Sequence, residues 1–194
     1  TQQQLRDVLR AELAAQLDDC DHLIAGDLLD NFTVDTGEVI ALYHIFADWL
    51  TKRGRRLALL RGNHDFSMRG SAASSFDLLS SILRAQFPEQ VTVASEVTEW
   101  KQFVLIPHLP NNDILNVELG KLGDVRGKVF VLHANVDNFY AADSQHSLNV
   151  SIEQIEDVVS RGNLVVCGHE HQHRSLVGGR CVVLGNTAPS SVAD

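Results

Sequence analysis

Four short apolar runs, each followed at once by polar residues of the kind that bind metal ions, constrain the fold of this chain more than any other feature. The runs end at Gly26-Asp27, at Gly62-Asn63-His64-Asp65, at His133 and at Gly168-His169-Glu170-His171. Short apolar runs bounded by turn residues are typical of buried strands. In open α/β sheets, ligand groups lie at the carboxyl ends of the strands. The sequence therefore predicts strands whose ends meet at one site.

Between these runs, apolar residues recur at helical spacing. Helices are predicted over residues 3–17, 36–53, 76–87, 111–122 and 151–161. The last of them begins with Ser151, and Gln154 follows three residues later, which is the pattern of a capping box. Strands are predicted over residues 20–25, 57–60, 91–93, 103–106, 128–132, 163–167 and 180–184, and a polar loop over 134–148. Alternating strands and helices predict an α/β layered fold, and 194 residues suit one domain.

Composition narrows the class of protein. The formal charge of −9 at pH 7 argues against a general nucleic-acid binder, which displays a basic face, but it does not exclude a nuclease, because bound divalent cations reverse the local sign. No apolar run approaches the roughly 20 residues needed to cross a bilayer, and no charged-then-apolar leader opens the chain. We therefore expect a cytoplasmic protein with no membrane partner. Cys20, Cys167 and Cys181 form no Cys-x-x-Cys pair, so reduced, structural thiols are expected.

The residues at the strand ends offer one carboxylate, one amide oxygen and several imidazoles: Asp27, Asn63, His64, His133, His169 and His171. Nitrogen and oxygen donors without thiolates suit a divalent ion such as Mn, Fe, Zn or Ni and differ from a structural, cysteine-rich zinc site. Two ions held about 3.5–4 Å apart need a bridging ligand. A carboxylate can bridge and a neutral imidazole cannot, so Asp27 is the expected bridge.

Four motifs each follow a predicted strand, in the order Gly-Asp-x-x-Asp, Gly-Asn-His-Asp, a later His and Gly-His-x-His. Together they resemble the motifs of the calcineurin-like metallophosphoesterase superfamily. The resemblance covers nearly the whole chain. It implies an α/β fold of the metallophosphoesterase type, a double β-sheet sandwich flanked by helices, formed by residues 1–194 as a single domain. It also implies a metal-dependent phosphoesterase in which two metal ions activate a bridging hydroxide against a phosphate ester.

The same resemblance implies which residues bind the two ions. Asp27 would bridge both ions, Asn63, His133 and His169 would complete one site, and His171 would serve the other. The superfamily normally begins with Asp-x-His on its first strand, which supplies two ligands to the ion that His171 serves. No Asp-x-His precedes Asp27 here. Either the sequence lacks its true N-terminus and first strand, which we expect, or the first metal site is incomplete.

Catalysis is assigned by the resemblance to His64 and Asp65. His64 would act beside the metals as the general acid or as a stabiliser of the transition state, oriented by Asp65. An imidazole can give a proton to a departing alkoxide near neutral pH, because its unperturbed pKa lies in that range. Asp30 is interpreted as a supporting or helix-capping carboxylate rather than a ligand. An intact His64-Asp65 pair has no evident role in a protein without catalysis.

Three parts of the sequence look most like SbcD-type nuclease subunits and their phage-encoded relatives. They are the stretches Gly-Asp-Leu-Leu-Asp-Asn-Phe and Leu-Ile-Pro-His-Leu-Pro and the loop after His133. This finer resemblance implies a DNA phosphodiesterase that uses manganese and pairs with an ATPase subunit. Two alternatives stay open. One is a phosphatase or phosphodiesterase for a nucleotide, a cyclic nucleotide or a phosphoprotein. The other is a binding scaffold with the same fold and no catalysis, which the missing Asp-x-His would fit.

Overall fold

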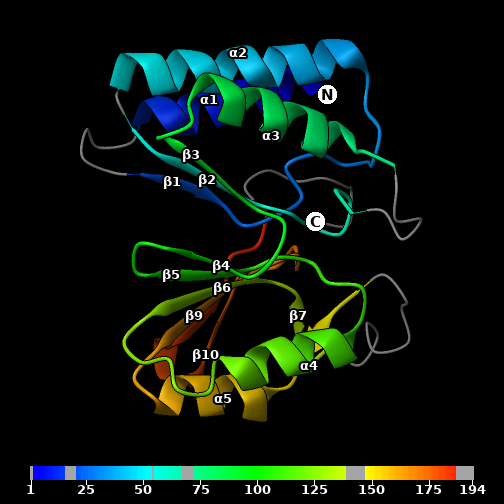
Figure 1. Cartoon of the computed structure of the whole chain (residues 1–194). Coiled ribbons are helices and arrows are strands. Elements are labelled where there is room, and N and C mark those ends of the chain that lie inside the picture. The colour runs from blue at the N-terminus through cyan, green and yellow to red at the C-terminus, as the bar shows by residue number, and fades with distance from the viewer. Residues whose placement is uncertain (1, 16–20, 54, 67–71, 139–146, 187–194) are drawn as a thin grey trace.

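The first half of the chain builds a three-stranded parallel sheet and the helices that cover it. The computed structural model describes residues 2–15, 21–53, 55–66, 72–138 and 147–186. In chain order the first elements are α1 (Gln2–Ala15), β1 (His22–Ile24), α2 (Thr36–Arg53), β2 (Leu57–Leu60), α3 (Ser75–Gln86) and β3 (Val91–Ala94). The strands lie in the order β1-β2-β3, and all three helices lie on the outer side of this sheet (Figure 1).

The second half builds a six-stranded mixed sheet. Its elements are β4 (Thr98–Trp100), β5 (Phe103–Ile106), α4 (Asn112–Lys121), β6 (Val129–His133), β7 (Asn135–Val136), β8 (Asn149–Val150), α5 (Ile152–Ser160), β9 (Leu164–Gly168), β10 (Arg174–Leu176), a 3-10 turn (Val177–Gly179) and β11 (Cys181–Val183). The strand order is β10-β11-β9-β6-β5-β4, with antiparallel strands at both edges and parallel strands between them. Helices α4 and α5 cover the outer face of this sheet (Figure 1).

The two sheets pack face to face, which confirms the predicted double-sheet sandwich. Alternate residues of a strand point to opposite faces, and β2 is buried on both. Leu57 and Leu59 pack in the core beneath α1, α2 and α3, whereas Ala58 and Leu60 face the other sheet. The rest of the core between the sheets comes from Ala94, Trp100, Leu105 and Val131. A third core fills the space between the six-stranded sheet and the helices α4 and α5.

The helix α5 shows how local sequence fixes an element in this third core. Its N-cap Ser151 and Gln154 form the predicted capping box, in which Ser151 N donates to Gln154 Oε1 at 2.9 Å and Gln154 N donates to Ser151 Oγ at 3.3 Å. The apolar face of α5 packs over β9 and β11, where Cys167 and Cys181 are buried free thiols, as predicted. Cys20 lies outside the described residues.

Three short strands, β7, β8 and β10, were not predicted. The segment 134–148, predicted as a loop, contributes β7, which pairs in parallel with β8 through Asn135 opposite Asn149 and Val136 opposite Val150; residues 139–146 lie outside the described part. Strand β10 pairs antiparallel with β11. These strands of two or three residues are too short to show a hydrophobic period. None of the described helices has the length and apolar character needed to cross a lipid bilayer.

Candidate metal centre

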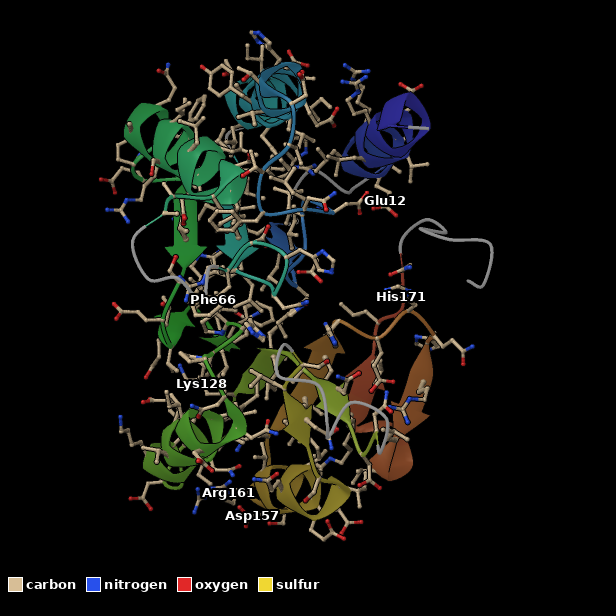
Figure 2. The ribbon with its side chains drawn as sticks, turned by 90° about the vertical axis from the view of Figure 1, so that its right-hand side faces the viewer. Glu12, Phe66, Lys128, Asp157, Arg161 and His171 are labelled. Atoms are coloured by element: carbon tan, nitrogen blue, oxygen red, sulfur yellow. The ribbon has the colours of Figure 1, made fainter. Side chains whose placement is uncertain are left out.

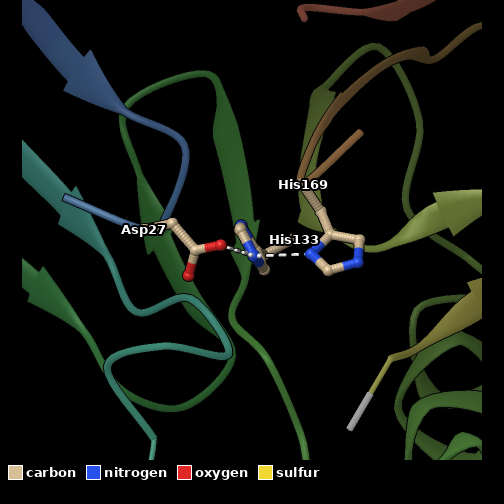
Figure 3. Close-up of side chains that lie close together, drawn as sticks. All are labelled: Asp27, His133 and His169. Atoms are coloured by element: carbon tan, nitrogen blue, oxygen red, sulfur yellow. Dashed lines mark hydrogen bonds and ion pairs between the residues drawn. The ribbon is translucent and has the colours of Figure 1, made fainter. Parts of the chain in front are cut away.

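The carboxyl ends of β1, β2, β6 and β9 meet where the two sheets face each other. Asp27 and Asn63 follow strands of the three-stranded sheet, whereas His133 ends β6 and His169 follows β9 in the six-stranded sheet. Asp27 has φ 49° and His169 has φ 83°. Non-glycine residues with positive φ are strained and cluster at functional sites. Figure 3 shows Asp27 approaching from one side, and His133 and His169 from the other.

Atoms with lone pairs from these four residues converge around Nε2 of His133. That nitrogen lies 3.1 Å from Asp27 Oδ2, 2.9 Å from Asn63 Oδ1 and 3.2 Å from His169 Nδ1. Asn63 Oδ1 is also 2.9 Å from His169 Nδ1. The ligand atoms of Asp27, His133 and His169 all lie within 4.8 Å of one another, close enough to share one ion.

The hydrogen bond that Nδ1 of His133 makes determines the charge needed at Nε2, where the four side chains converge. Without a positive charge there, the convergence is unfavourable. His133 Nδ1 lies 2.9 Å from the main-chain oxygen of Ala25, which can only accept, so Nδ1 carries a proton. In a neutral imidazole, Nε2 then has a bare lone pair that faces an amide oxygen and a carboxylate. Lone pairs repel unless a proton or a cation lies between them. A set of two nitrogens and two oxygens fits a divalent transition ion.

The pKa values show where a proton lies when no cation is bound. Burial raises the pKa of Asp27, but the hydrogen bond and charge of His133 outweigh burial and lower it. Burial lowers the pKa of His133, but the hydrogen bond and charge of Asp27 outweigh it and raise that pKa. Burial, then the charge of His133, lowers the pKa of His169 to about 4. In the metal-free chain a proton on His133 therefore relieves the crowding, and a divalent ion must displace it.

Two glycines allow the sheets to approach closely at this end. A Cβ at Gly26, whose φ is +96°, would overlap the ring of His133, and a Cβ at Gly168 would overlap the carbonyl oxygen of Ala25. The same Ala25 oxygen accepts the hydrogen bond from His133. Glycine is needed at both positions because no side chain fits between the layers. This explains the glycine in front of Asp27 and in front of His169.

His64 and Asp65 follow Asn63 but have different surroundings. The main-chain N of His64 donates to Asp27 Oδ1 at 3.0 Å, and its exposed ring donates from Nδ1 to the main-chain oxygen of Asp30 at 2.5 Å. Asp65 is buried, and its Oδ2 accepts from Gly62 N at 2.9 Å. No hydrogen bond joins Asp65 to the ring of His64 in the described part of the chain: the Asp30 carbonyl holds the ring, and Asp65 closes the turn that carries Asn63.

His171 lies on the wall of the same cavity but outside the compact cluster. The cavity has a volume of about 520 Å³, and Asp27, His64, His133, His169 and His171 all lie on its wall, which continues along β1 and α1. His171 is exposed, and Figure 2 shows it between α1, which carries Glu12, and the six-stranded sheet. The structure thus brings four predicted ligands together and leaves the fifth at the cavity wall.

Two further residues near the cluster, His108 and Glu170, were assigned no role from the sequence. His108 is buried with its ring centroid 6.5 Å from that of His133, and burial, followed by the charge of His133, lowers the pKa of His108 to about 3. Glu170, between His169 and His171, accepts from Val136 N at 2.7 Å and pairs with Arg174. The position of Glu170 inside the histidine motif was the available signal.

Comparison with known families agrees with this geometry. A family model described as calcineurin-like phosphoesterase matches residues 2–173, well over half of the chain. The chain belongs to the calcineurin-like phosphoesterase family. No curated protein matches it.

As a calcineurin-like phosphoesterase, the protein is a metal-dependent hydrolase of phosphoesters, and the predicted superfamily is confirmed. Members of this family bind divalent metals, and Asp27, His133 and His169 form a candidate ligand group. The roles of single residues, the identity of the metal and the likeness to SbcD-type nucleases stay predictions.

Proposed function

We propose that this calcineurin-like phosphoesterase is a DNA phosphodiesterase that uses two divalent ions, with manganese as the expected ion. The observation that carries the proposal is the convergence of Asp27, Asn63, His133 and His169 on one point at the wall of an open cavity. This supports hydrolysis at a metal centre. The choice of DNA is supported by the resemblance of the sequence around Asp27 and His108 to SbcD-type subunits.

Each ligand has a defined task in this proposal. Asn63, His133 and His169 bind one ion together with Asp27, and His171 binds a second ion that Asp27 shares. Oδ2 of Asp27 faces His133 while Oδ1 accepts from a main-chain N–H, so the carboxylate is held in place beside the other ligands. When bound, divalent ions supply a water of lowered pKa and positive charge at the phosphoryl oxygens.

His64 holds the proton for the leaving group. Its Nδ1–H is donated to the Asp30 carbonyl, so in the imidazolium form Nε2–H gives its proton to the departing alkoxide and leaves a neutral ring that keeps Nδ1–H. The exposed ring lies on the cavity wall, where a large substrate can reach it. A positioned general acid contributes typically 10²–10⁴-fold to a rate, and His64→Ala should lose activity in that range.

A comparison of four substrates tests the proposal. Chromogenic phosphodiester and phosphomonoester substrates, single-stranded DNA and double-stranded DNA are each incubated with the protein and Mn²⁺. We expect hydrolysis of the diester and of DNA, strong loss of activity in Asp27→Asn and His64→Ala, and unchanged activity in His44→Ala. His44 is a matched control because it is an exposed histidine on α2.

Other outcomes would replace the proposed function. Preference for the monoester would indicate a phosphatase. Metal analysis that finds no ion or one ion per chain, together with no hydrolysis of any of the four substrates, would indicate a scaffold. Two ions per chain with cleavage of the diester but not of DNA would indicate a phosphodiesterase for a smaller substrate.

A further inference from the structure

His169 faces the metal centre with one ring nitrogen and contacts a serine with the other. Nδ1 lies 2.9 Å from Asn63 Oδ1, and Nε2 lies 2.7 Å from Ser147 Oγ. A neutral imidazole carries its proton on only one nitrogen. Nδ1 therefore offers a lone pair to an ion only when the proton is on Nε2, where a partner must accept it.

Ser147 is itself held by a buried amide. Asn135 is 4% exposed and donates from Nδ2 to Ser147 Oγ at 2.7 Å and to the main-chain oxygen of Leu148 at 3.1 Å. A carbonyl oxygen can only accept, so the amide nitrogen of Asn135 must be the atom on this side. Ser147 Oγ thus accepts from Asn135 with one lone pair and keeps another for His169.

The hydroxyl allows two arrangements of protons. When Ser147 O–H donates to Nε2, the proton of His169 is on Nδ1 and is donated to Asn63 Oδ1. When His169 Nε2–H donates to Ser147 Oγ, the lone pair of Nδ1 faces the cluster. Only the second arrangement can bind a cation. A hydroxyl supports both, and removing it leaves Nε2–H without this acceptor.

We propose that Ser147 is a positioning residue of the metal centre, which accepts the Nε2–H of His169 so that Nδ1 binds the ion, and that Asn135 holds Ser147 in place. The inference rests on the proposed binding of an ion by His169. The corresponding acceptor for His133 is the main-chain oxygen of Ala25, which no substitution removes. Partners of this kind, behind a ligand, typically change metal affinity 10–100-fold when mutated.

Titration of the metal-free chain with Mn²⁺ in a calorimeter tests the inference. We expect Ser147→Ala to weaken Mn²⁺ binding about 10–100-fold and Ser147→Thr, which keeps the hydroxyl, to bind within about 3-fold of the wild type. Ser147→Val differs from Ser147→Thr by replacing the hydroxyl with a methyl group and should lose affinity as Ser147→Ala does. This pair gives the test if Ser147→Ala fails to fold, and circular dichroism checks the fold of each variant.

A matched control is Ser160→Ala. Ser160 is an exposed serine whose Oγ donates to the main-chain oxygen of Asp157 at 2.7 Å in α5. Its loss should leave Mn²⁺ affinity unchanged. A second readout is spectroscopic: in the Zn²⁺-loaded protein labelled with ¹⁵N-histidine, the Nε2–H of His169 should exchange slowly with water. That protection should disappear in Ser147→Ala and Ser147→Val.

The two levels of inference fail in different ways. The role of Ser147 alone is overturned if Ser147→Ala and Ser147→Val bind Mn²⁺ with an affinity within about 2-fold of the wild type and keep the protection of the His169 Nε2–H. A wild-type chain that binds no divalent ion overturns the proposed function and the role of Ser147 with it.

Discussion

Replacement of Asp65 by Asn should stabilise the metal-free protein, and the gain should grow with pH. Asp65 is 1% exposed, its Oδ2 accepts from Gly62 N, and its Oδ1 has no hydrogen-bond partner among the described residues. Burial is the main reason that the pKa of Asp65 is raised from 3.8 to about 7, with a further contribution from the charge of Asp27. An amide of the same shape keeps the acceptor for Gly62 and cannot ionise.

The sign and size of the effect follow from linkage. Because the pKa of Asp65 is about 7 in the folded chain and 3.8 without the fold, stability that is present below pH 3.8 is lost as pH rises towards 7. One unit of pKa corresponds to about 1.4 kcal/mol, so the ionised carboxylate costs about 4 kcal/mol above pH 7. Between pH 5 and pH 8 this cost increases by about 3 kcal/mol.

Urea unfolding with a chelator present, at pH 5 and at pH 8, measures this difference. The free energy of unfolding of Asp65→Asn, relative to the wild type, should increase by about 3 kcal/mol between the two pH values. Asp113→Asn is the control, because Asp113 is an exposed carboxylate in the first turn of α4. A relative stability of Asp65→Asn that is the same at both pH values would refute the reasoning.

Three further perturbations have defined outcomes. Glu170→Ala should lower the free energy of unfolding by about 3 kcal/mol, because a buried N–H of β7 loses its charged acceptor, and Glu170→Gln should lower it less; urea titration measures both. When Mn²⁺ is present at about 100 times its Kd, addition of a chelator should lower Tm by roughly 5–10 °C. The Asp27→Asn variant should show no such change. Gly26→Ala should abolish Mn²⁺ binding in calorimetry because its Cβ overlaps His133, whereas Gly162→Ala, where a Cβ meets open space, should bind normally.

The place of the candidate site was predictable because it depends on strand ends. Apolar runs such as Leu57–Leu60 show where parallel strands stop, and residues that follow parallel strands of facing sheets come together. Asp27, Asn63, His133 and His169 therefore converge without any long-range information beyond the order of strands. The layered fold was predictable for the same reason, since strand and helix periods alternate along the chain.

The partners of the site residues could not be predicted. A ring nitrogen that donates to a main-chain oxygen needs only a peptide group, which every residue has, so the carbonyls of Ala25 and Asp30 leave no pattern in the sequence. The expected pairing of His64 with Asp65 relied on adjacency in sequence, but neighbouring side chains need not point the same way. Ser147 meets His169 only because the short β7–β8 ladder folds the chain back.

The contact between Gly168 and the Ala25 carbonyl has a consequence for which ion the protein accepts. At this end of the sandwich the distance between the layers is limited by one peptide group rather than by side chains. The proposed ligands come from both layers, so the space that they would leave for an ion follows from that distance. Discrimination between ions of different radius would then be a property of the whole scaffold, and Gly168→Ala should shift preference towards larger cations before it prevents folding.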